Sequence, residues 1–330
     1  MRPFQSFFLA AALLSVATFS SAAEQKPVLT VYTYDSFAGE WGPGPKIKLA
    51  FEAECNCELK WVALEDGVAI LNRLKLEGAH SKADVALGMD EAMLADARHS
   101  NLFVPHNADL KGLTLPGGWQ DTTFLPFDYG YFAFVYDSNK LKQPPQSMVE
   151  RNDLKIIYED PRTSTPGQGL LMWVRQVYGD TTPSAWQQLA KKTVTVTKGW
   201  SEAYGMFLKG QADLVLSYTS SPAYHRLAEG NQQYRAALFS EGHLRQVEVA
   251  AQLKNAPHPE LAQRFMQFIL HEHFQNQIPE GNWMYPVTGV NLPDGFNQNE
   301  TPAQTLQPDP QQVATQRKAW VKEWLQAVSR

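Results

Sequence analysis

Aromatic and hydroxyl-bearing side chains recur in this chain where apolar runs end or where helices are expected to begin. In α/β proteins these are the positions at which a ligand collects. Flat rings suit a heteroaromatic or cationic ligand, whereas hydroxyls and free backbone N–H groups suit an oxyanion. The pattern indicates a ligand-binding site, and its candidate residues are Tyr34, Asp66, Gly67, Ser164, Thr165, Trp200, Tyr218, Tyr224 and Trp283.

The segment from Thr165 to Gln168 has the pattern of a helix start. Thr165 is the expected N-cap, Pro166 the first helical residue, and Gln168 follows the cap by three positions. Backbone N–H groups and the hydroxyls of Ser164 and Thr165 would favour an oxyanion or a phosphate there. An ordinary helix cap explains the same residues equally well.

Asp66 and Gly67 follow an apolar run and form the corresponding helix start earlier in the chain. Asp66 is either an N-cap or the partner of a cationic or amine-bearing ligand group. The missing side chain of Gly67 would let that group approach the backbone closely.

Metal binding and catalysis find no support in the sequence. His271 and His273 are two apart on an expected helix, so they should diverge and lie at the surface. The sequence contains no HExxH or CxxC spacing, no GxSxG elbow, no GxGxxG and no P-loop. We therefore predict no metal, no cofactor and no enzymatic activity.

The first 23 residues are typical of a secretory signal peptide. Arg2 precedes the apolar stretch 7–16, and the small residues Ser21, Ala22 and Ala23 form a cleavage site, with cleavage expected after Ala23. The pattern predicts export from the cytoplasm. The net charge of −5 and the absence of a dense Lys/Arg run argue against a nucleic-acid partner.

Cys55 and Cys57 are the two cysteines of the chain and flank Asn56. In an oxidising compartment they would tend to be bridged, but a bridge requires a tight turn at Asn56. A reactive thiol is the alternative, although no neighbouring His is present to lower its pKa. The residues leave the state of this pair open.

Apolar runs and amphipathic stretches alternate from residue 29 onward, which predicts an α/β fold with a mainly parallel, layered sheet. The first lobe is expected to contain strands 29–34, 59–64 and 83–87 and helices 45–54, 67–77 and 90–99. A long strand, 128–137, then leaves this lobe. The second lobe is expected to contain strands 155–158, 193–197 and 213–218 and helices 166–178, 184–191 and 201–209.

Residues 247–253 are expected to cross back to the first lobe, followed by a helix at 259–277. Two crossings between two lobes make a hinge, and ligand binding by closure is the natural use of it. Residues 293–310 are expected to run over the surface, and a terminal helix over 311–328 should turn Val313, Trp320, Trp324 and Val328 inward. The expected division is a first lobe of 24–137 with 251–292, a second lobe of 138–250, and a segment 293–330 that either lobe could hold.

Nine sequence runs resemble the periplasmic thiamine-binding proteins of Gram-negative ABC importers. These are LTVYTYDSF (29–37), WGPGP (41–45), CNCELK (55–60), VALEDG (62–67), PFDYGYFAFVYD (126–137), EDPRTSTPG (159–167), KKTVTVTKGWSEAYG (191–205), DLVLSYTSSPAYH (213–225) and GNWMYPV (281–287). The resemblance covers nearly all of the chain after the signal peptide. It implies a two-lobed, Venus-flytrap, type II-like binding fold for thiamine and its mono- and diphosphate.

The resemblance also implies which residues contact the ligand. Tyr34, Tyr224 and Trp283 would build aromatic walls, and the remaining contacts would come from Asp66, Gly67, Ser164, Thr165, Trp200, Tyr218, Thr219, Ser220 and Ser221. The expected partners are an inner-membrane permease and its ATPase, with the binding protein itself a monomer.

Two other classes remain possible on this scaffold. Another small cation or ferric iron is one, with Tyr218 and Tyr224 as phenolate ligands, although iron carriers usually place two Tyr next to each other. A thiamine-degrading enzyme with a Cys nucleophile is the other, but Cys55 and Cys57 lie far from the features assigned to the cleft.

Overall fold

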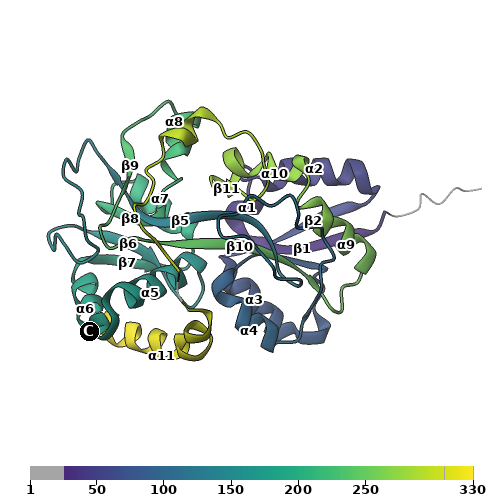
Figure 1. Ribbon diagram of the computed structural model, residues 1–330, viewed down its shortest axis with the longest axis horizontal. Helices are drawn as coiled ribbons and strands as arrows, with labels where there is room; N and C mark the ends of the chain where they lie inside the picture. Colours follow the sequence, from purple (N-terminus) through teal and green to yellow (C-terminus); the bar gives the residue numbers. More distant parts are fainter. Residues whose placement is uncertain (1–25, 308, 330) are drawn as a thin grey trace, which may run out of the picture.

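The computed structural model describes residues 26–307 and 309–329, so the predicted signal peptide lies outside the described residues. Figure 1 shows two α/β lobes side by side, connected by two long strands. One sheet runs through both lobes in the order β2-β1-β3-β10-β5-β8-β6-β7. Its strands are β1 (Val28–Tyr34), β2 (Glu58–Leu64), β3 (Val85–Asp90), β5 (Leu125–Asp137), β6 (Ile156–Glu159), β7 (Thr193–Thr197), β8 (Leu214–Tyr218) and β10 (His243–Leu253).

Lobe 1 is built on the parallel strands β2, β1 and β3. Its apolar strand side chains pack with the buried faces of helices into one core, which includes Val31, Leu74 and Phe265. These helices are α2 (Gly44–Cys55), α3 (Gly67–Glu77), α4 (Leu94–His99) and α9 (Pro259–Phe268). The alternation of strand and helix in the sequence therefore predicts this lobe well.

Lobe 2 repeats the design with the parallel strands β8, β6 and β7. Its main core contains the large rings of Trp173, Trp186 and Trp324. The helices are α5 (Thr165–Tyr178), α6 (Thr182–Lys192), α7 (Trp200–Leu208) and α8 (Pro222–Ala228).

Strands β5 and β10 form the hinge. They pair antiparallel to each other between the lobes, with Glu248 opposite Asp128. Along β5, Phe127 belongs to the core of lobe 1 and Phe132 to that of lobe 2. The expectation of a mainly parallel sheet is thus correct only for the three outer strands of each lobe, β2-β1-β3 and β8-β6-β7. The hinge strands run antiparallel because the chain crosses once in each direction.

The helix expected over 259–277 is wrong in its second half. Helix α9 ends at Phe268, and a short helix, α10 (Glu272–Gln275), begins after a break. His271 has an extended backbone and caps α10, since its ring nitrogen accepts a hydrogen bond from the N–H of His273. A π-turn, η4 (Ile278–Asn282), follows and leads to Trp283.

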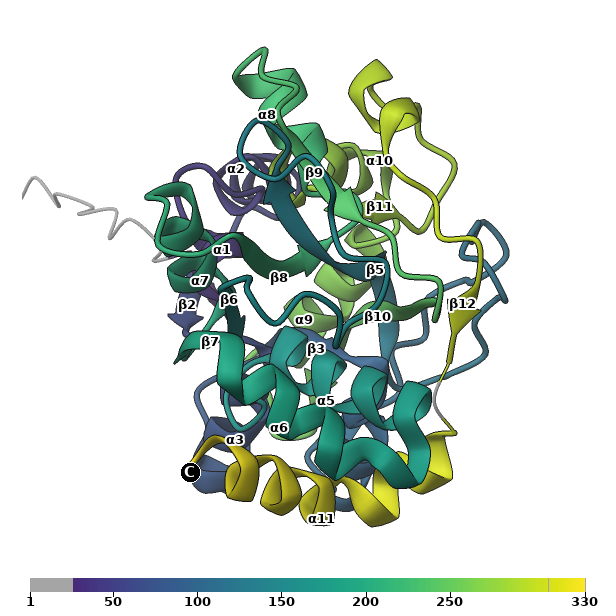
Figure 2. The same ribbon diagram turned by 90° about the vertical axis from the view of Figure 1, so that its left-hand side faces the viewer.

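The terminal helix α11 (Pro310–Val328) packs mainly on α6 and α5 of lobe 2. Figure 2 shows it lying along the outer side of these helices. Val313, Trp320 and Trp324 are buried as predicted, and Val328 is partly buried. Arg317 also reaches lobe 1 and forms an ion pair with Asp96 (2.9 Å).

The segment before this helix is more ordered than the sequence suggests. It contains a 3₁₀ turn, η5 (Asp294–Gln298), and a short strand, β12 (Thr305–Leu306), that pairs with β10. Phe296 is buried against Tyr285. The segment therefore runs over the surface as predicted, but Phe296 and β12 anchor it to the rest of the protein.

A disulfide joins Cys55 and Cys57 at the end of α2. Asn56 between them adopts the left-handed conformation (φ 51°), which supplies the tight turn that such a bridge requires. Over the described ranges, we find no helix with the length and apolar character needed to span a membrane.

Candidate ligand-binding site

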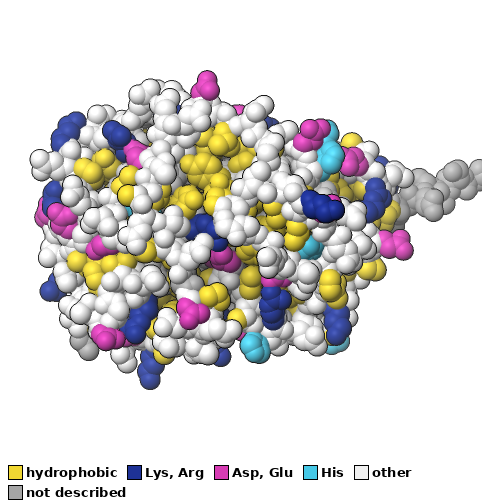
Figure 3. Space-filling model, in the orientation of Figure 1, with side chains coloured by type: hydrophobic (Ala, Val, Ile, Leu, Met, Phe, Trp, Pro, Cys, Tyr) yellow, Lys and Arg dark blue, Asp and Glu magenta, His cyan; other side chains and the backbone are white. Residues whose placement is uncertain are grey.

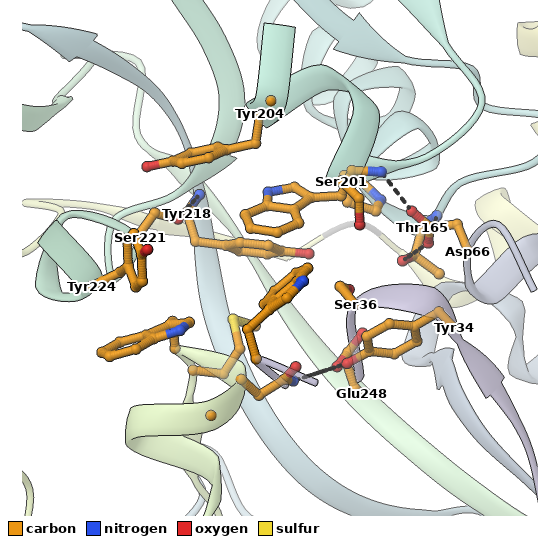
Figure 4. A pocket seen from close by; sticks show the side chains of 18 of the residues that line it. Tyr34, Ser36, Asp66, Thr165, Ser201, Tyr204, Tyr218, Ser221, Tyr224 and Glu248 are labelled. Atoms are coloured by element: carbon orange, nitrogen blue, oxygen red, sulfur yellow. Dashed lines mark hydrogen bonds between the residues drawn. The ribbon is translucent and has the colours of Figure 1, made fainter. Parts of the chain in front are cut away.

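A cavity of about 300 Å³ lies between the two lobes. Figure 3 shows apolar side chains gathered along the middle of the molecule, where the lobes meet. The cavity is lined by side chains from the strand ends and helix starts of both lobes and from the hinge (Figure 4). This is the location that the sequence pattern predicts.

Most of the candidate residues reach this cavity. Those that line it are Tyr34, Asp66, Thr165, Trp200, Tyr218, Ser221, Tyr224 and Trp283. Those that lie outside the lining are Gly67, Ser164, Thr219 and Ser220. The side chains of Thr219 and Ser220 are fully buried in the turn between β8 and α8.

Asp66 connects the two lobes at one end of the cavity. Its carboxylate accepts hydrogen bonds from the Ser164 hydroxyl (2.9 Å), from the Thr165 N–H (3.1 Å) and hydroxyl (3.0 Å), and from the Trp200 N–H (3.3 Å). It also accepts one from the N–H of Gly67 (2.6 Å), as the N-cap of α3. We call Asp66 with Ser164, Thr165 and Trp200 the closing contact.

The closing contact corrects two predictions about the helix start at Thr165. The N-cap of α5 is Ser164, whose hydroxyl accepts from the N–H of Gly167 (3.3 Å), and Thr165 already lies inside the helix. The donors expected to face an anionic ligand instead face Asp66. The sequence predicts that an anion binds at this helix start, and the carboxylate of Asp66 is such an anion. The protein's own side chain therefore occupies the predicted anion site.

Gly67 also has a different role from the one predicted. A Cβ at this position would lie 2.1 Å from the carbonyl oxygen of Gly88 and 2.6 Å from Cγ2 of Thr165. A Cβ on Gly199, in lobe 2, would lie 2.4 Å from the carbonyl oxygen of Glu65. These two glycines therefore allow the lobes to meet, rather than allowing a ligand to approach.

Aromatic rings form the walls of the cavity. Trp200 stacks on Tyr204 at a ring separation of 4.9 Å, and its indole N–H donates to the hydroxyl of Ser217 (2.8 Å). On another side, Trp283 meets Tyr224 edge to face at 5.1 Å. Trp283 has a left-handed backbone (φ 57°), which directs the chain out of the π-turn.

The inner end of the cavity is formed by polar residues of the hinge. Glu248 on β10 lines the cavity, and its carboxylate accepts from the hydroxyl of Tyr34 (2.7 Å). Asn282 donates to Asp128 (2.6 Å) and to Tyr34 (2.8 Å) through its amide nitrogen. Figure 4 shows Glu248 and Tyr34 close together at this end.

A second chain of hydrogen bonds continues across the same strands. The hydroxyl of Tyr218 donates to the side-chain oxygen of Gln246 (2.6 Å), and the nitrogen of Gln246 donates to Asp90 (3.0 Å). Asp90, Glu248 and Asp128 are opposite one another on β3, β10 and β5. We call Asp90, Asp128, Gln246 and Glu248 the hinge floor.

Burial strongly disfavours negative charge in the hinge floor. It raises the pKa of Asp90 to about 7 and that of Asp128 to about 7. Burial and the neighbouring charge of Asp128 raise the pKa of Glu248 well above its ordinary value. Within residues 26–307 and 309–329, the cavity lining contains the acids Asp66 and Glu248 and no Lys, Arg or His. A cationic ligand would relieve this imbalance.

Sequence reasoning missed several lining residues, of which Glu248 and Asn282 matter most. The others include Ser36, Trp41, Ser201, Tyr204 and Met284. One signal was available, because Glu248 stands between Val247 and Val249 in a run expected to be a buried strand. An acid inside such a run requires a partner or a function.

The prediction that His271 and His273 diverge is wrong. Their rings stack at 5.0 Å and 7°, because the helix is interrupted between them. Together with Glu54 they form an exposed group whose possible ligand atoms lie within 4.8 Å of one another. The ring nitrogen of His271 already accepts a backbone hydrogen bond, so we assign no ion to this surface group.

The sequence and the structure of this chain are both similar to those of known bacterial binding proteins. Residues 32–272 match the family described as bacterial extracellular solute-binding protein. A thiamine-binding periplasmic protein of Escherichia coli (strain K12) is 63% identical over 309 residues, which cover 92% of this chain and 94% of that protein. A solved structure described as a periplasmic thiamin binding protein has a TM-score of 0.91 and 63% identity, covering 92% of this chain and 97% of that one.

More distant structures share the fold. The ferric binding protein from Campylobacter jejuni has a TM-score of 0.73 at 17% identity, covering 91% of this chain and 99% of that one. At this identity the likeness concerns the two-lobed architecture alone.

Proposed function

The chain belongs to the family of bacterial extracellular solute-binding proteins, and we propose that it is the periplasmic component that captures thiamine for an ABC importer. It is a binding protein rather than an enzyme, as its relatives are. The observation that carries the proposal is the cavity itself, which combines aromatic walls with an acidic lining and lies between two hinged lobes.

Thiamine fits the chemistry of this cavity. Its thiazolium ring carries a permanent positive charge, its aminopyrimidine stacks and forms hydrogen bonds, and its hydroxyethyl tail can carry phosphate. The rings would lie against Tyr34, Trp200, Tyr218, Tyr224 and Trp283. An aromatic face is worth about 0.5 to 2 kcal/mol to a cation, depending on how far the pair is removed from water.

The tail would point toward the closing contact. Ser164, Thr165 and the N–H of Trp200 are the donors there, and all of them bond to Asp66 in this structure. A phosphate would have to share these donors with Asp66 or displace it. Thiamine, its monophosphate and its diphosphate are all proposed ligands, and this competition would determine their ranking.

Transport follows from closure around the ligand. Contacts from both lobes make the closed state bind better than the open state, which is the requirement for ligand-driven closure. The closed protein, a monomer, would then deliver thiamine to an inner-membrane permease and its ATPase. Residues 1–23 would direct export to the periplasm and be removed after Ala23.

The iron and enzyme alternatives are less well supported. Burial and nearby carboxylates raise the pKa of Tyr218 well above its ordinary value, which opposes the phenolate that iron requires. Cys55 and Cys57 are joined to each other and lie outside the cavity lining, so neither is placed as a nucleophile.

Native mass spectrometry of the purified protein, followed by titration with thiamine while tryptophan fluorescence is recorded, tests the proposal. We expect a bound mass matching a thiamine species, and quenching that saturates at one ligand per chain. A protein that retains no ligand and does not respond to thiamine would contradict the proposal. Visible charge-transfer colour with ferric iron would favour the iron alternative.

A further inference from the structure

Two buried acids face each other across the hinge strands. Glu248 and Asp128 are direct partners in the antiparallel pairing of β10 and β5, and they are 4% and 0% exposed. The negative charge of Asp128 favours the proton on Glu248. Because Glu248 lines the cavity, a ligand would meet this pair directly.

Among the described residues, the groups that act on the pair add no positive charge to it. Tyr34 on β1 and Asn282 on η4 donate neutral hydrogen bonds, and Tyr218 on β8 is a neutral phenol. The other acids that act on this region are Asp90 on β3 and Asp66 in the closing contact. The positive charge of Arg317 acts on the neighbouring acid Asp90, whose pKa it lowers. A proton is therefore the cation that the empty pair can hold most readily.

We infer that Asp128 and Glu248 are a proton-linked counter-ion for the cationic ring of the ligand, which holds one proton in the empty protein and releases it when the ring binds. The inference rests on the proposed function, since it concerns how the same cavity takes a permanent cation. In the exchange, the O–H bond of the protonated carboxyl breaks, the proton passes to solvent, and the ring's charge replaces it. The total charge of the cavity stays constant.

The exchange has a defined pH dependence. Because the empty pair carries a proton that the complex lacks, binding becomes tighter as pH rises through the range in which the empty pair is protonated. The limit is about tenfold in Kd per pH unit for one proton released. The pair also lies on the two strands that connect the lobes, so its proton would be coupled to the hinge.

Isothermal titration calorimetry in buffers of different ionisation enthalpy measures the protons released per ligand bound. We would compare thiamine with deazathiamine, in which a carbon replaces the ring nitrogen and removes the charge, between about pH 6 and pH 8. Both ligands keep the aminopyrimidine, so its own titration cancels. We expect close to one proton released with thiamine and none with deazathiamine.

Two variants identify the source of the proton. Glu248→Gln mimics the protonated side chain and should abolish the release, whereas Glu40→Gln, the same change at an exposed position outside the cavity lining, should retain it. Thiamine binding without proton release, equal release with both ligands, or release that persists in Glu248→Gln would overturn the inference. If either variant fails to fold, the two-ligand comparison on the unaltered protein still decides. Failure of thiamine to bind in any buffer would overturn the proposed function as well.

Discussion

The closing contact and the hinge floor lie at opposite ends of one cavity, and each presents a carboxylate to it. Asp66 accepts five hydrogen bonds, three of them from backbone N–H groups at the starts of α3, α5 and α7. Glu248 receives the hydroxyl of Tyr34 and a long contact from Asn282 (3.4 Å), and stands beside a second acid. The carboxylate of Asp66 thus has hydrogen-bond donors from both lobes. The carboxylate of Glu248 has few donors and an acid as its neighbour.

This difference shows how topology assigns roles to like residues. Helix starts concentrate N–H donors, so an acid placed there serves the protein by joining the lobes. Antiparallel hinge strands place side chains directly opposite each other, so two acids placed there repel each other. A bound cation or a proton relieves that repulsion. Under the proposed function, Asp66 would therefore serve closure, and Glu248 recognition of the ligand's charge.

Replacing Glu248 by Gln should produce the largest change in affinity. The variant keeps an acceptor for Tyr34 but removes the counter-charge from a buried site, so the Kd for thiamine should rise about 100-fold. Calorimetric titration measures it. Glu40→Gln makes the same chemical change at an exposed position next to Trp41 and should stay within about twofold. An equal loss for uncharged deazathiamine would show that Glu248 acts through shape rather than charge.

Removing the ring of Trp283 should have the next largest effect on the affinity for thiamine, because this ring is part of the aromatic wall of the cavity. Trp283→Ala should weaken thiamine binding about 20-fold, within the range of a desolvated cation–π contact. Trp283→Phe keeps an aromatic face against Tyr224 and should cost only about threefold. Comparable losses in both variants would indicate that the left-handed backbone at this position, rather than the ring, is what matters.

Replacing Asp66 by Asn tests the other side of the comparison. If its carboxylate competes with phosphate for the donors of Ser164, Thr165 and Trp200, the variant should favour thiamine monophosphate over thiamine by about fivefold more than the unaltered protein does. The measured quantity is the ratio of the two dissociation constants. Glu65→Gln, at the exposed neighbouring position, should leave that ratio unchanged. A preference shifted toward unphosphorylated thiamine would mean that Asp66 does not compete.

The elements and the position of the site follow from local sequence signals. Apolar runs that alternate with amphipathic stretches give the strands and helices, and the residues that end those strands, such as Tyr34 and Tyr218, do meet at one cavity. Local patterns suffice here because α/β topology brings strand ends to one edge whatever the details of packing.

Pairings across the chain do not follow from such signals. Asp66 and Ser164 are 98 positions apart, and nothing in either segment indicates that their side chains would form a hydrogen bond. The meeting of Glu248 with Asp128 depends on the register of two hinge strands, which a one-residue shift would abolish. The stacking of His271 on His273 depends on a helix break that periodicity alone does not reveal.

Removing the disulfide at the end of α2 should have the smallest effect on ligand affinity. This variant tests whether affinity depends only on residues at the cavity, such as those of the closing contact and the hinge floor. The bridge closes a loop of only three residues, so removing it should cost about 1 to 2 kcal/mol of unfolding free energy in the loop-entropy model. Neither cysteine lines the cavity, so the Kd for thiamine should change less than about twofold in a Cys55→Ser, Cys57→Ser double variant. Chemical denaturation and titration measure the two quantities on one sample. A large loss of affinity with little loss of stability would mean that the end of α2 affects the cavity from a distance. Affinity would then depend on lobe 1 as a whole, and not on Asp66 and Glu248 alone.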